Sequence, residues 1–507
     1  MKLLENGIEG KLFKVVYNMY KDVKSCVFNN NEYSDFFISH NGVRQGENLS
    51  PMLFAMFVND LESHLWSNGV SAVELSEPDL DCYLKLSVIM YADDTVLVSD
   101  SPKGLQDALD SLLLYTKRWK LKVNEGKTSV LVFCKRTSKK IKDLRFKLGN
   151  TDLENVNSYK YLGLVFTSNG RFKESIKYLC NQAQKAMFSV IKKARSLQLP
   201  LDVHLFHSTV MPIALYGCEV WGYEDCGMVE RLHLKFCKYI LRVKSSTPNF
   251  MVYGELGEFP TSISIKTRMV NFWLRLLNDK NSKYSKIVYH MLLSMVHNNV
   301  GKSAWITYIR HILSENGFNN VWCEPLHYNR YWVDHVFKQR LKDQFIQTWN
   351  ENVYESSKGI NYRIFKTKFG YEPYLNVLPY NLACVLCKFR TCNHRLPIEA
   401  GRFVNLPRNE RTCTCSNKLG DEFHFLFECT HVKDLRSKYL DVNVVNCPNT
   451  FKFYNVMNST DMRPQVAPRS LVMVYIKNIS KYIRKVSDST RLKPLSSTTN
   501  WLPGNEM

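Results

Sequence analysis

The sequence contains no long apolar run. Among its 507 residues, no stretch of about 20 apolar residues could span a bilayer. No apolar segment near the N-terminus resembles a signal peptide. The 15 cysteines therefore indicate reduced thiols rather than a disulfide framework. We expect a protein without a membrane partner that lies inside the cell, in the nucleus or the cytoplasm.

Acidic side chains are too few to balance the basic ones. There are 47 Asp and Glu against 68 Lys and Arg, which gives a net charge of +21 and indicates a polyanion partner. Residues 135–147 and 171–195 are especially basic, and 135–140 is either a nuclear import signal or a basic loop. In the second segment one helical face is apolar, and it consists of Ile176, Leu179, Ala183, Met187, Val190 and Ala194. The lysines off this face either meet nucleic-acid phosphates or are simply solvated.

The composition also excludes a largely disordered chain. Hydrophobic residues make up 45% and charged residues 23% of the sequence. The length allows two to four domains, each with its own core. The sequence does not indicate an oligomeric state.

Two adjacent aspartates lie between two short β-prone runs. Residues 84–90 and 95–99 are rich in aliphatic and β-branched side chains, which is typical of buried strands. The segment Tyr91-Ala92-Asp93-Asp94 is then the turn of a hairpin. Adjacent carboxylates repel each other, and a bound Mg²⁺ ion would remove that repulsion. The alternative is an acidic turn without a metal, because Asp is common in turns.

A second motif, Arg44-Gln45-Gly46, precedes the acidic turn. We predict a helix over residues 51–64 after it, with Ser50 as its N-cap and Pro51 in its first turn. Gly46 would let the backbone approach a nucleotide or template base, and Arg44 could reach a phosphate. The alternative is a well-capped amphipathic helix after an ordinary turn.

These motifs, in this order, resemble the reverse transcriptase of a LINE-type (non-LTR) retrotransposon. Three further segments are similar to that family and follow in the family's order, at residues 123–129, 159–164 and 214–222. The resemblance covers roughly residues 1–275, with scattered similarity to about residue 435.

The resemblance implies an RNA-directed DNA polymerase, a nucleotidyltransferase that extends a primer 3′-hydroxyl through two Mg²⁺ ions. Its partners would be an RNA template, a DNA primer or target, and dNTPs. Asp93 and Asp94 would be the catalytic, Mg²⁺-binding residues. The remaining site residues that the resemblance implies are Arg44, Gln45, Gly46, Tyr91 and Lys127 for nucleotide or template, and Tyr161, Leu162 and Gly163 for the primer grip.

The family's polymerase needs a further aspartate on a strand before the Arg-Gln-Gly motif. Asp22 and Asp35 lie in that region, but neither has the aliphatic context of such a strand. We therefore expect a chain truncated at its N-terminus, without the first catalytic strand, the fingers or an endonuclease. Because in-line transfer needs both ions held in place, we expect the chain alone not to polymerise DNA.

A group of cysteines and a histidine lies near residue 420. Cys413, Cys415, His424 and Cys429 resemble a zinc-knuckle-like motif of these proteins, and a segment at 388–399 is similar to the one that precedes it. Three thiolates and one imidazole can hold Zn²⁺ tetrahedrally. The first pair has one residue between its cysteines where the family has two, so either Cys413 ligates or another thiol replaces it. Cys384 and Cys387 are interpreted as buried thiols.

The fold class that follows is α+β, a reverse-transcriptase palm remnant followed by a helical thumb, a helical C-terminal region and the zinc-knuckle-like motif. Five tryptophans, Trp273, Trp305, Trp322, Trp332 and Trp349, either stack on bases or lie in the core, and the core is favoured. The expected domains are the partial palm at 1–165, the thumb at 166–250, a helical connector at 251–380, the cysteine/histidine region at 381–440, and a C-terminal helix (468–486) with a disordered tail (490–507) within 441–507.

Two other functions remain open beside the polymerase. One is a noncatalytic RNA- or DNA-binding remnant that keeps the basic helix and the zinc motif. The other is a translated pseudogene fragment. A functional remnant would prefer structured RNA or primer-template over random duplex, with a steep salt dependence.

Overall fold

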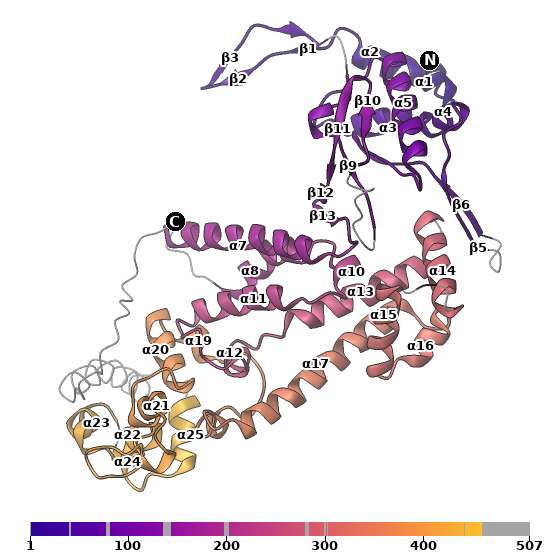
Figure 1. The fold of residues 1–507 in the computed structure, drawn as a ribbon. Helices are drawn as coiled ribbons and strands as arrows, with labels where there is room; N and C mark the ends of the chain where they lie inside the picture. Colours follow the sequence, from indigo (N-terminus) through magenta and orange to yellow (C-terminus); the bar gives the residue numbers. More distant parts are fainter. Residues whose placement is uncertain are drawn as a thin grey trace. The chain divides into compact units, whose positions relative to one another are not determined.

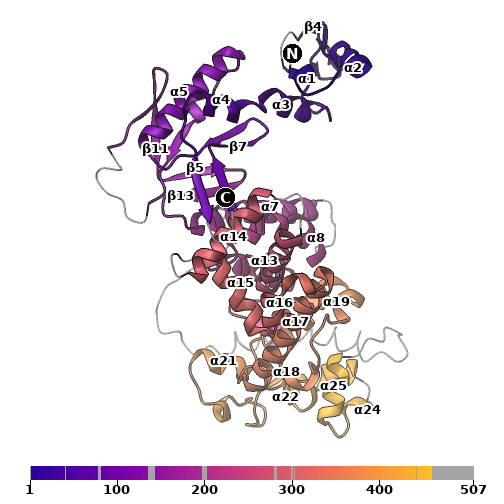
Figure 2. The same cartoon turned by 90° about the vertical axis from the view of Figure 1, so that its right-hand side faces the viewer.

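The computed structural model forms two compact units, one from Met1–Glu174 with Asp279–Ile306 and one from Ser175–Asn278 with Thr307–Met507 (Figures 1 and 2). The residues that the structure describes are 2–39, 42–77, 82–134, 143–196, 202–278, 283–298, 301, 303–440 and 442–458. The expected basic loop at 135–140 and the expected C-terminal helix and tail lie outside them. Within the described residues, no helix is long and apolar enough to cross a membrane.

The first unit mixes helices and strands. Its helical elements are α1 (Lys2–Glu5), α2 (Gly10–Tyr20), α3 (Ser50–Val58), α4 (Leu61–Ser67), α5 (Pro102–Arg118), η2 (Glu125–Lys127) and α14 (Lys283–His297). Its strands are β1 (Lys24–Ser25), β2 (Phe28–Asn29), β3 (Glu32–Tyr33), β4 (Phe37–Ile38), β5 (Val73–Glu77), β6 (Cys82–Leu86), β7 (Val88–Tyr91), β8 (Asp94–Leu97), β9 (Ser129–Leu131), β10 (Phe146–Leu148), β11 (Thr151–Val156), β12 (Ser158–Tyr161) and β13 (Leu164–Thr167).

Helix α5 organises the core of the first unit. It begins after Ser101, whose hydroxyl accepts a hydrogen bond from the Gly104 N–H at 3.2 Å. One part of the helix packs its Ala108 and Tyr115 with α4 and with partly buried residues of β7 and β8. Another part packs against the three-stranded sheet β10-β11-β9, in which β11 is antiparallel to β10 and parallel to β9 (Figure 1). Helix α5 therefore packs against both the β7–β8 hairpin and the β10-β11-β9 sheet. The β12–β13 hairpin follows β11 directly in the chain.

The second unit is helical. Its elements are α7 (Lys173–Ser196), which begins at the end of the first unit, α8 (Val203–Thr209), α9 (Met211–Ala214), α10 (Cys218–Trp221), α11 (Gly227–Ile240), α12 (Asn249–Leu256), α13 (Thr261–Asn278), α15 (Ala304–Glu315), α16 (Asn319–Cys323), η3 (Pro325–His327), α17 (Arg330–Glu355), α18 (Tyr362–Phe365), α19 (Tyr374–Val377), α20 (Tyr380–Arg390), α21 (Pro397–Phe403), η4 (Arg408–Glu410), α22 (Glu422–Phe427), η5 (Thr430–Val432), α23 (Lys433–Tyr439), α24 (Val442–Val445) and α25 (Thr450–Asn458). Among the described residues, every strand lies in the first unit.

The core of the second unit extends from α11 to α25 around α12. Helix α12 lies against α17 so closely that a Cβ on Gly254 would come within 2.9 Å of the Trp349 ring. The Trp349 indole N–H donates to the Phe250 carbonyl at 2.8 Å. A buried ion network lies beside it, where the fully buried Arg390 guanidinium contacts Glu255 at 3.0 Å and Glu372 at 2.8 Å. This core joins the Cys/His region to the helices that precede it.

The expected apolar face of residues 171–195 is confirmed in α7. Ile176, Leu179, Ala183, Met187 and Ala194 are buried, and Ile191 is buried where we expected Val190. The lysines off this face are exposed, and they are Lys177, Lys185, Lys192 and Lys193. The segment 214–222 contains the last residue of α9 and the whole of α10, with Gly217 between the two helices at a φ of 67°.

Three local expectations are wrong. The helix predicted over 51–64 is two helices, α3 and α4, and they are separated at Asn59 and Asp60. Pro51 does lie in the first turn, but Leu49 is the N-cap, and the Ser50 hydroxyl donates instead to the Arg44 carbonyl at 2.6 Å. The strands beside the acidic turn are exposed or half-buried rather than buried, and Ser87 separates β6 from β7.

The tryptophans are divided between core and surface. Trp273 and Trp349 are fully buried, as favoured, and Trp305 and Trp322 are half-buried. Trp332 contradicts the expectation, because it is 48% exposed and stacks on Tyr328 at the start of α17.

Candidate active site and metal centre

The acidic segment is a tight hairpin, as predicted. Strands β7 and β8 pair antiparallel with Tyr91 opposite Asp94, which leaves Ala92 and Asp93 as a two-residue turn. Ala92 takes a φ of 52°, the left-handed conformation that short hairpin turns require. The side chains of Asp93 and Asp94 are exposed. The turn therefore presents two adjacent carboxylates at one tip.

The predicted primer-grip segment is a second hairpin. Strands β12 and β13 pair with Tyr161 opposite Leu164, and both turn residues, Leu162 and Gly163, have positive φ values of 46° and 84°. Two consecutive positive values are the pattern of a type I′ turn, which matches the twist of the strands.

Tyr161 connects the two hairpins electrostatically. Its hydroxyl is buried and has no hydrogen-bond partner among the described residues. Burial raises the pKa of Tyr161, and the negative charge of Asp94 raises it further. A phenol whose pKa is raised remains protonated at neutral pH and can donate a hydrogen bond.

The segment of Lys127 is held against the second hairpin. It is a single 3₁₀ turn, η2, whose Lys127 carbonyl accepts a hydrogen bond from the Tyr159 hydroxyl at 2.9 Å. The side chain of Lys127 is exposed. Sequence reasoning did not identify Tyr159 as a contact of Lys127, because nothing in the spacing links residues 32 positions apart.

The Arg44 segment makes different contacts. The Arg44 guanidinium donates to the Met19 carbonyl at 2.7 Å and lies 3.9 Å from Glu47. Gln45 and Gly46 form an exposed turn, and Gly46 has a φ of 87° with open space around it. The contacts that the structure shows for Arg44 therefore lead to α2 and Glu47, and not to the acidic hairpin.

Within the part of the chain that the structure describes, the acidic tip belongs to no larger ligand group. Among the described residues, neither Asp93 nor Asp94 takes part in a group of three or more His, Cys, Asp or Glu whose ligand atoms lie within 4.8 Å of one another. Asp22 follows the C-terminal end of α2 with a φ of 56°, and Asp35 lies between β3 and β4.

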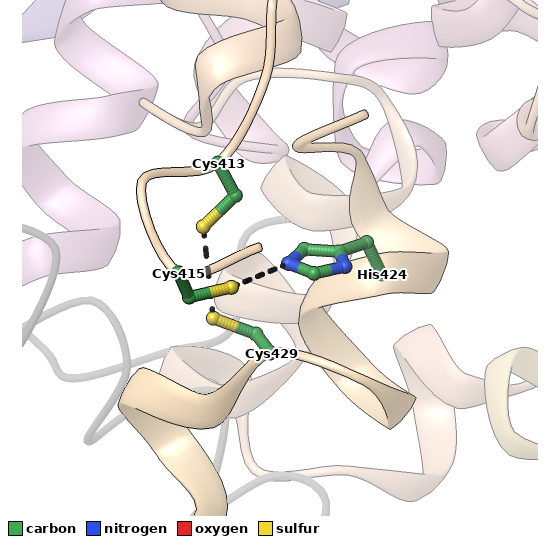
Figure 3. A group of neighbouring side chains, drawn as sticks. All are labelled: Cys413, Cys415, His424 and Cys429. Atoms are coloured by element: carbon green, nitrogen blue, oxygen red, sulfur yellow. Dashed lines mark hydrogen bonds between the residues drawn. The ribbon is translucent and has the colours of Figure 1, made fainter. Parts of the chain in front are cut away.

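The four residues of the Cys/His motif come together in the second unit. One ligand atom from each of Cys413, Cys415, His424 and Cys429 lies within 4.8 Å of all the others, so the one-residue spacing of the first pair does not separate its sulfurs (Figure 3). The Cys413 and Cys429 sulfurs are 3.8 Å apart, and the Cys415 sulfur lies 3.2 Å from His424 Nε2. Two sulfurs bound to one tetrahedral zinc at about 2.3 Å would be roughly 3.8 Å apart.

A turn and a short helix hold these side chains in place. The Cys413 N–H donates to the Lys418 carbonyl at 2.8 Å, and the backbone returns to pair Thr412 with Leu419. His424 lies on α22, whose N-cap Asp421 accepts the His424 N–H at 2.9 Å. His424 Nδ1 lies 3.4 Å from Glu428, a carboxylate that can orient the ring.

Thiolate formation at this site is favoured at one cysteine. Burial opposes ionisation of Cys415, but hydrogen bonds from Ser416 and the Thr430 backbone lower the pKa of this thiol to about 6. Burial raises the pKa of Cys429 to about 12. The other cysteine pair, Cys384 and Cys387, is buried as expected, and burial raises the pKa of both thiols.

A further pair beside this motif was missed from the sequence. His394 Nε2 contacts the buried Glu422 carboxylate at 2.7 Å, while its Nδ1 accepts the Leu396 N–H at 3.3 Å. The pair fastens the 388–399 segment to α22, which carries His424. The similarity of residues 388–399 to the family indicated that this segment is important. It did not indicate that His394 would contact Glu422.

Comparison with known proteins is consistent with these motifs. Residues 5–166 match the family model of the reverse transcriptase (RNA-dependent DNA polymerase). The chain is 27% identical over 219 residues to the probable RNA-directed DNA polymerase from transposon BS of Drosophila melanogaster, which is 41% of this chain and 23% of that protein. It is 26% identical over 220 residues to the RNA-directed DNA polymerase from mobile element jockey of the same species, with 41% of this chain and 22% of that protein covered.

A third relative belongs to another retrotransposable element. The chain is 26% identical over 212 residues to the retrovirus-related Pol polyprotein from the type-2 retrotransposable element R2DM of Drosophila melanogaster. The match covers 40% of this chain and 19% of that protein. The chain thus spans less than a quarter of the length of these relatives. The resemblance to LINE-type reverse transcriptases is confirmed.

Proposed function

We propose, from the reverse transcriptase domain that residues 5–166 carry, that this chain is part of the RNA-directed DNA polymerase of a non-LTR retrotransposon. The reaction is the addition of dNTPs to the 3′-hydroxyl of a DNA primer on an RNA template. The observation that supports it best is the β7–β8 hairpin within that domain, whose turn presents the adjacent carboxylates of Asp93 and Asp94. In the same unit, the Tyr159 hydroxyl of the second hairpin donates to the Lys127 carbonyl.

The residues at the acidic tip fit a hard divalent cation. Asp93 and Asp94 offer carboxylate oxygens, which Mg²⁺ prefers, and both side chains are exposed to an incoming ion. Held by these two carboxylates, Mg²⁺ would supply a positive charge that lowers the pKa of the primer hydroxyl and stabilises the leaving pyrophosphate. The Tyr161 hydroxyl, which has no partner among the described residues, would donate to Asp94 and orient that carboxylate.

The remaining site residues would position the substrates. Tyr161, Leu162 and Gly163 would support the primer end from the second hairpin. The exposed ammonium of Lys127 would meet the triphosphate. The other residues that would contact nucleotide or template are Arg44, Gln45, Gly46 and Tyr91.

The Cys/His motif of the second unit would hold Zn²⁺ through Cys413, Cys415, His424 and Cys429. The 3.8 Å separation of the Cys413 and Cys429 sulfurs suits a tetrahedral ion. Zinc would supply a structural link between the turn at residues 413–418 and α22, and the exposed lysines of α7 would add to nucleic-acid affinity.

Iron-mediated cleavage tests the metal role without requiring turnover. Fe²⁺ replaces Mg²⁺ at such sites, and with peroxide it cuts the backbone nearby. With primer-template and dNTP bound, we expect cuts near residues 91–94 and 159–163 in the intact chain and none in Asp93→Asn. The control Asp100→Asn removes an exposed carboxylate shortly after β8 and should leave the cuts unchanged. Equal cleavage in Asp93→Asn would refute the assignment of the ion to this tip.

Primer extension tests the activity itself. No third carboxylate among the described residues joins Asp93 and Asp94, so we expect no Mg²⁺-dependent extension by this chain alone. Extension that Asp93→Ala abolishes would show that the chain completes its own site. If neither cleavage nor extension occurs but primer-template binds with a steep salt dependence, the noncatalytic binding function replaces the polymerase.

A further inference from the structure

Three side chains of the second unit converge far from the Cys/His motif in the sequence. They are His207 on α8, His233 on α11 and Glu258, which lies just after α12. One ligand atom from each lies within 4.8 Å of the other two. None of them belongs to the sequence motifs of the polymerase.

The separations suit a single small cation. The Glu258 Oε2 atom lies 2.8 Å from His207 Nε2 and 3.4 Å from His233 Nε2. A tetrahedral ion with bonds of about 2.0–2.1 Å to nitrogen and oxygen holds its ligand atoms roughly 3.3–3.4 Å apart. The His233–Glu258 separation already matches this value, and the His207–Glu258 separation is about half an ångström shorter.

His233 supplies a second, independent observation. Its side chain is fully buried, and neither ring nitrogen has a hydrogen-bond partner among the described residues. A buried imidazole that makes no hydrogen bond of good geometry is poorly satisfied, and its nearest charged neighbours are the Glu230 carboxylate at 3.7 Å and the Glu258 carboxylate at 3.4 Å. The Nε2 atom is directed at the Glu258 carboxylate, at a distance too long for a good hydrogen bond but suitable for a shared ion.

Neighbouring groups hold the His233 ring in one orientation. Phe206 stacks on it with ring centroids 5.8 Å apart and an interplanar angle of 17°. Its Nδ1 side faces the Glu230 carboxylate at 3.7 Å. Glu230 is itself held by the Thr261 N–H and hydroxyl, both at 2.7 Å. A metal-binding histidine commonly has such a carboxylate at its other nitrogen.

We propose that His207, His233 and Glu258 form a second metal site of this chain, which binds a divalent transition-metal ion of the zinc type. Two imidazoles and one carboxylate are ligands that suit Zn²⁺, and three protein ligands leave the fourth position to water. The His207 side chain is 42% exposed, so the ion can reach the site from solvent. The site rests neither on the Cys/His motif nor on polymerase activity.

The site would fasten three segments of the helical unit. His207 comes from α8, His233 from α11, and Glu258 from the connection between α12 and α13. In the chain, His207 and Glu258 are 51 residues apart. An ion that joins them would stabilise the packing of α8 on α11, because it binds only the folded arrangement.

Zinc stoichiometry of the full chain separates this site from the Cys/His motif. After purification with zinc and removal of loosely bound metal, we expect about two zinc ions per chain, one for each site. Cys429→Ser should lose the ion of the Cys/His motif, and His207→Ala should lose the other. The matched control is His204→Ala, which removes an exposed histidine from the same helix and should keep both ions.

Cobalt substitution identifies which ion is lost. Co²⁺ bound by thiolates has strong charge-transfer absorption, whereas Co²⁺ bound by imidazole and carboxylate lacks it. We expect His207→Ala and Glu258→Gln to remove only the band set without thiolate character, with unchanged circular dichroism. Equal zinc contents of wild type, His207→Ala and Glu258→Gln would overturn the proposal. A Cys429→Ser variant that contains no zinc would also overturn the proposal. In either case the three residues would form an ion pair without a metal.

Discussion

The buried Arg390 offers the clearest test of what holds the second unit together. Its guanidinium is inaccessible to solvent and contacts Glu255, which is equally buried, and Glu372, which is 13% exposed. It also donates to the Met457 carbonyl at 2.8 Å. These partners come from α12, the segment before α19, and α25, so one side chain connects three parts of the unit.

Replacement of Arg390 by Met keeps much of the side-chain volume but removes the charge. Glu372 retains Lys366 as a partner at 2.5 Å, whereas Glu255 loses its cation in a fully buried place. Removal of one member of a buried ion pair costs about 3–5 kcal/mol, because the remaining charge is uncompensated. We therefore expect Arg390→Met to lower the free energy of unfolding of the second unit by about 3–5 kcal/mol.

Urea unfolding followed by tryptophan fluorescence and circular dichroism measures this loss. The control is Arg395→Met, an exposed arginine five residues further on, for which we expect a change within about 0.5 kcal/mol. The double variant Arg390→Met with Glu255→Leu removes both charges and should recover part of the loss. A loss below about 1 kcal/mol, or no recovery in the double variant, would refute the reasoning.

Three further outcomes follow from local structure. Gly163→Val should destabilise the first unit by about 1 kcal/mol or more, because residue 163 has a φ of 84°, and an unchanged urea midpoint would contradict this. Ser101→Ala should cost about 1 kcal/mol through loss of the cap of α5, and a melting temperature equal to wild type would show that the cap is unimportant. Because burial raises the pKa of Cys218 to about 12, iodoacetamide at pH 8 should modify the exposed Cys323 and spare Cys218 until the chain unfolds. Mass spectrometry of the peptides would show early modification of Cys218 if that inference were wrong.

The acidic hairpin could be predicted from sequence because its information is local, whereas the hairpin formed by β12 and β13 was expected only from the family resemblance. Two short β-prone runs on either side of Tyr91-Ala92-Asp93-Asp94 are a property of a few adjacent residues. The apolar face of α7 was predicted for the same reason, since helical spacing alone places Met187 and Ala194 on one side.

The break after α3 could not be predicted in this way. Asp60 lies at the break, and the hydroxyl of Tyr115 donates to its carboxylate at 2.6 Å from 55 residues away. Lys2 forms an ion pair with the same carboxylate. Helical spacing continued across this point in the sequence, so only the long-range contacts show why the chain turns here.

The Cys/His motif was predicted from the sequence only in part. Family spacing singled out Cys413, Cys415, His424 and Cys429, but the short first spacing left the role of Cys413 open. The backbone bond from Cys413 to Lys418 closes the turn and brings the Cys413 sulfur to 3.8 Å from Cys429. The number of residues between two cysteines predicts only the usual turn. The backbone conformation of residues 413–418 determines the position of the Cys413 sulfur.

The sequence by itself determined the reverse transcriptase resemblance, the acidic hairpin, the basic helix and the candidate zinc ligands, because each depends on short segments of the chain. Only the tertiary structure decided that Tyr159 binds the backbone of Lys127, that Arg390 joins three segments, and that His207, His233 and Glu258 meet. The physical reason is that burial and electrostatic contact depend on distance in space. The packing of whole helices sets that distance, and no local pattern of residues encodes it.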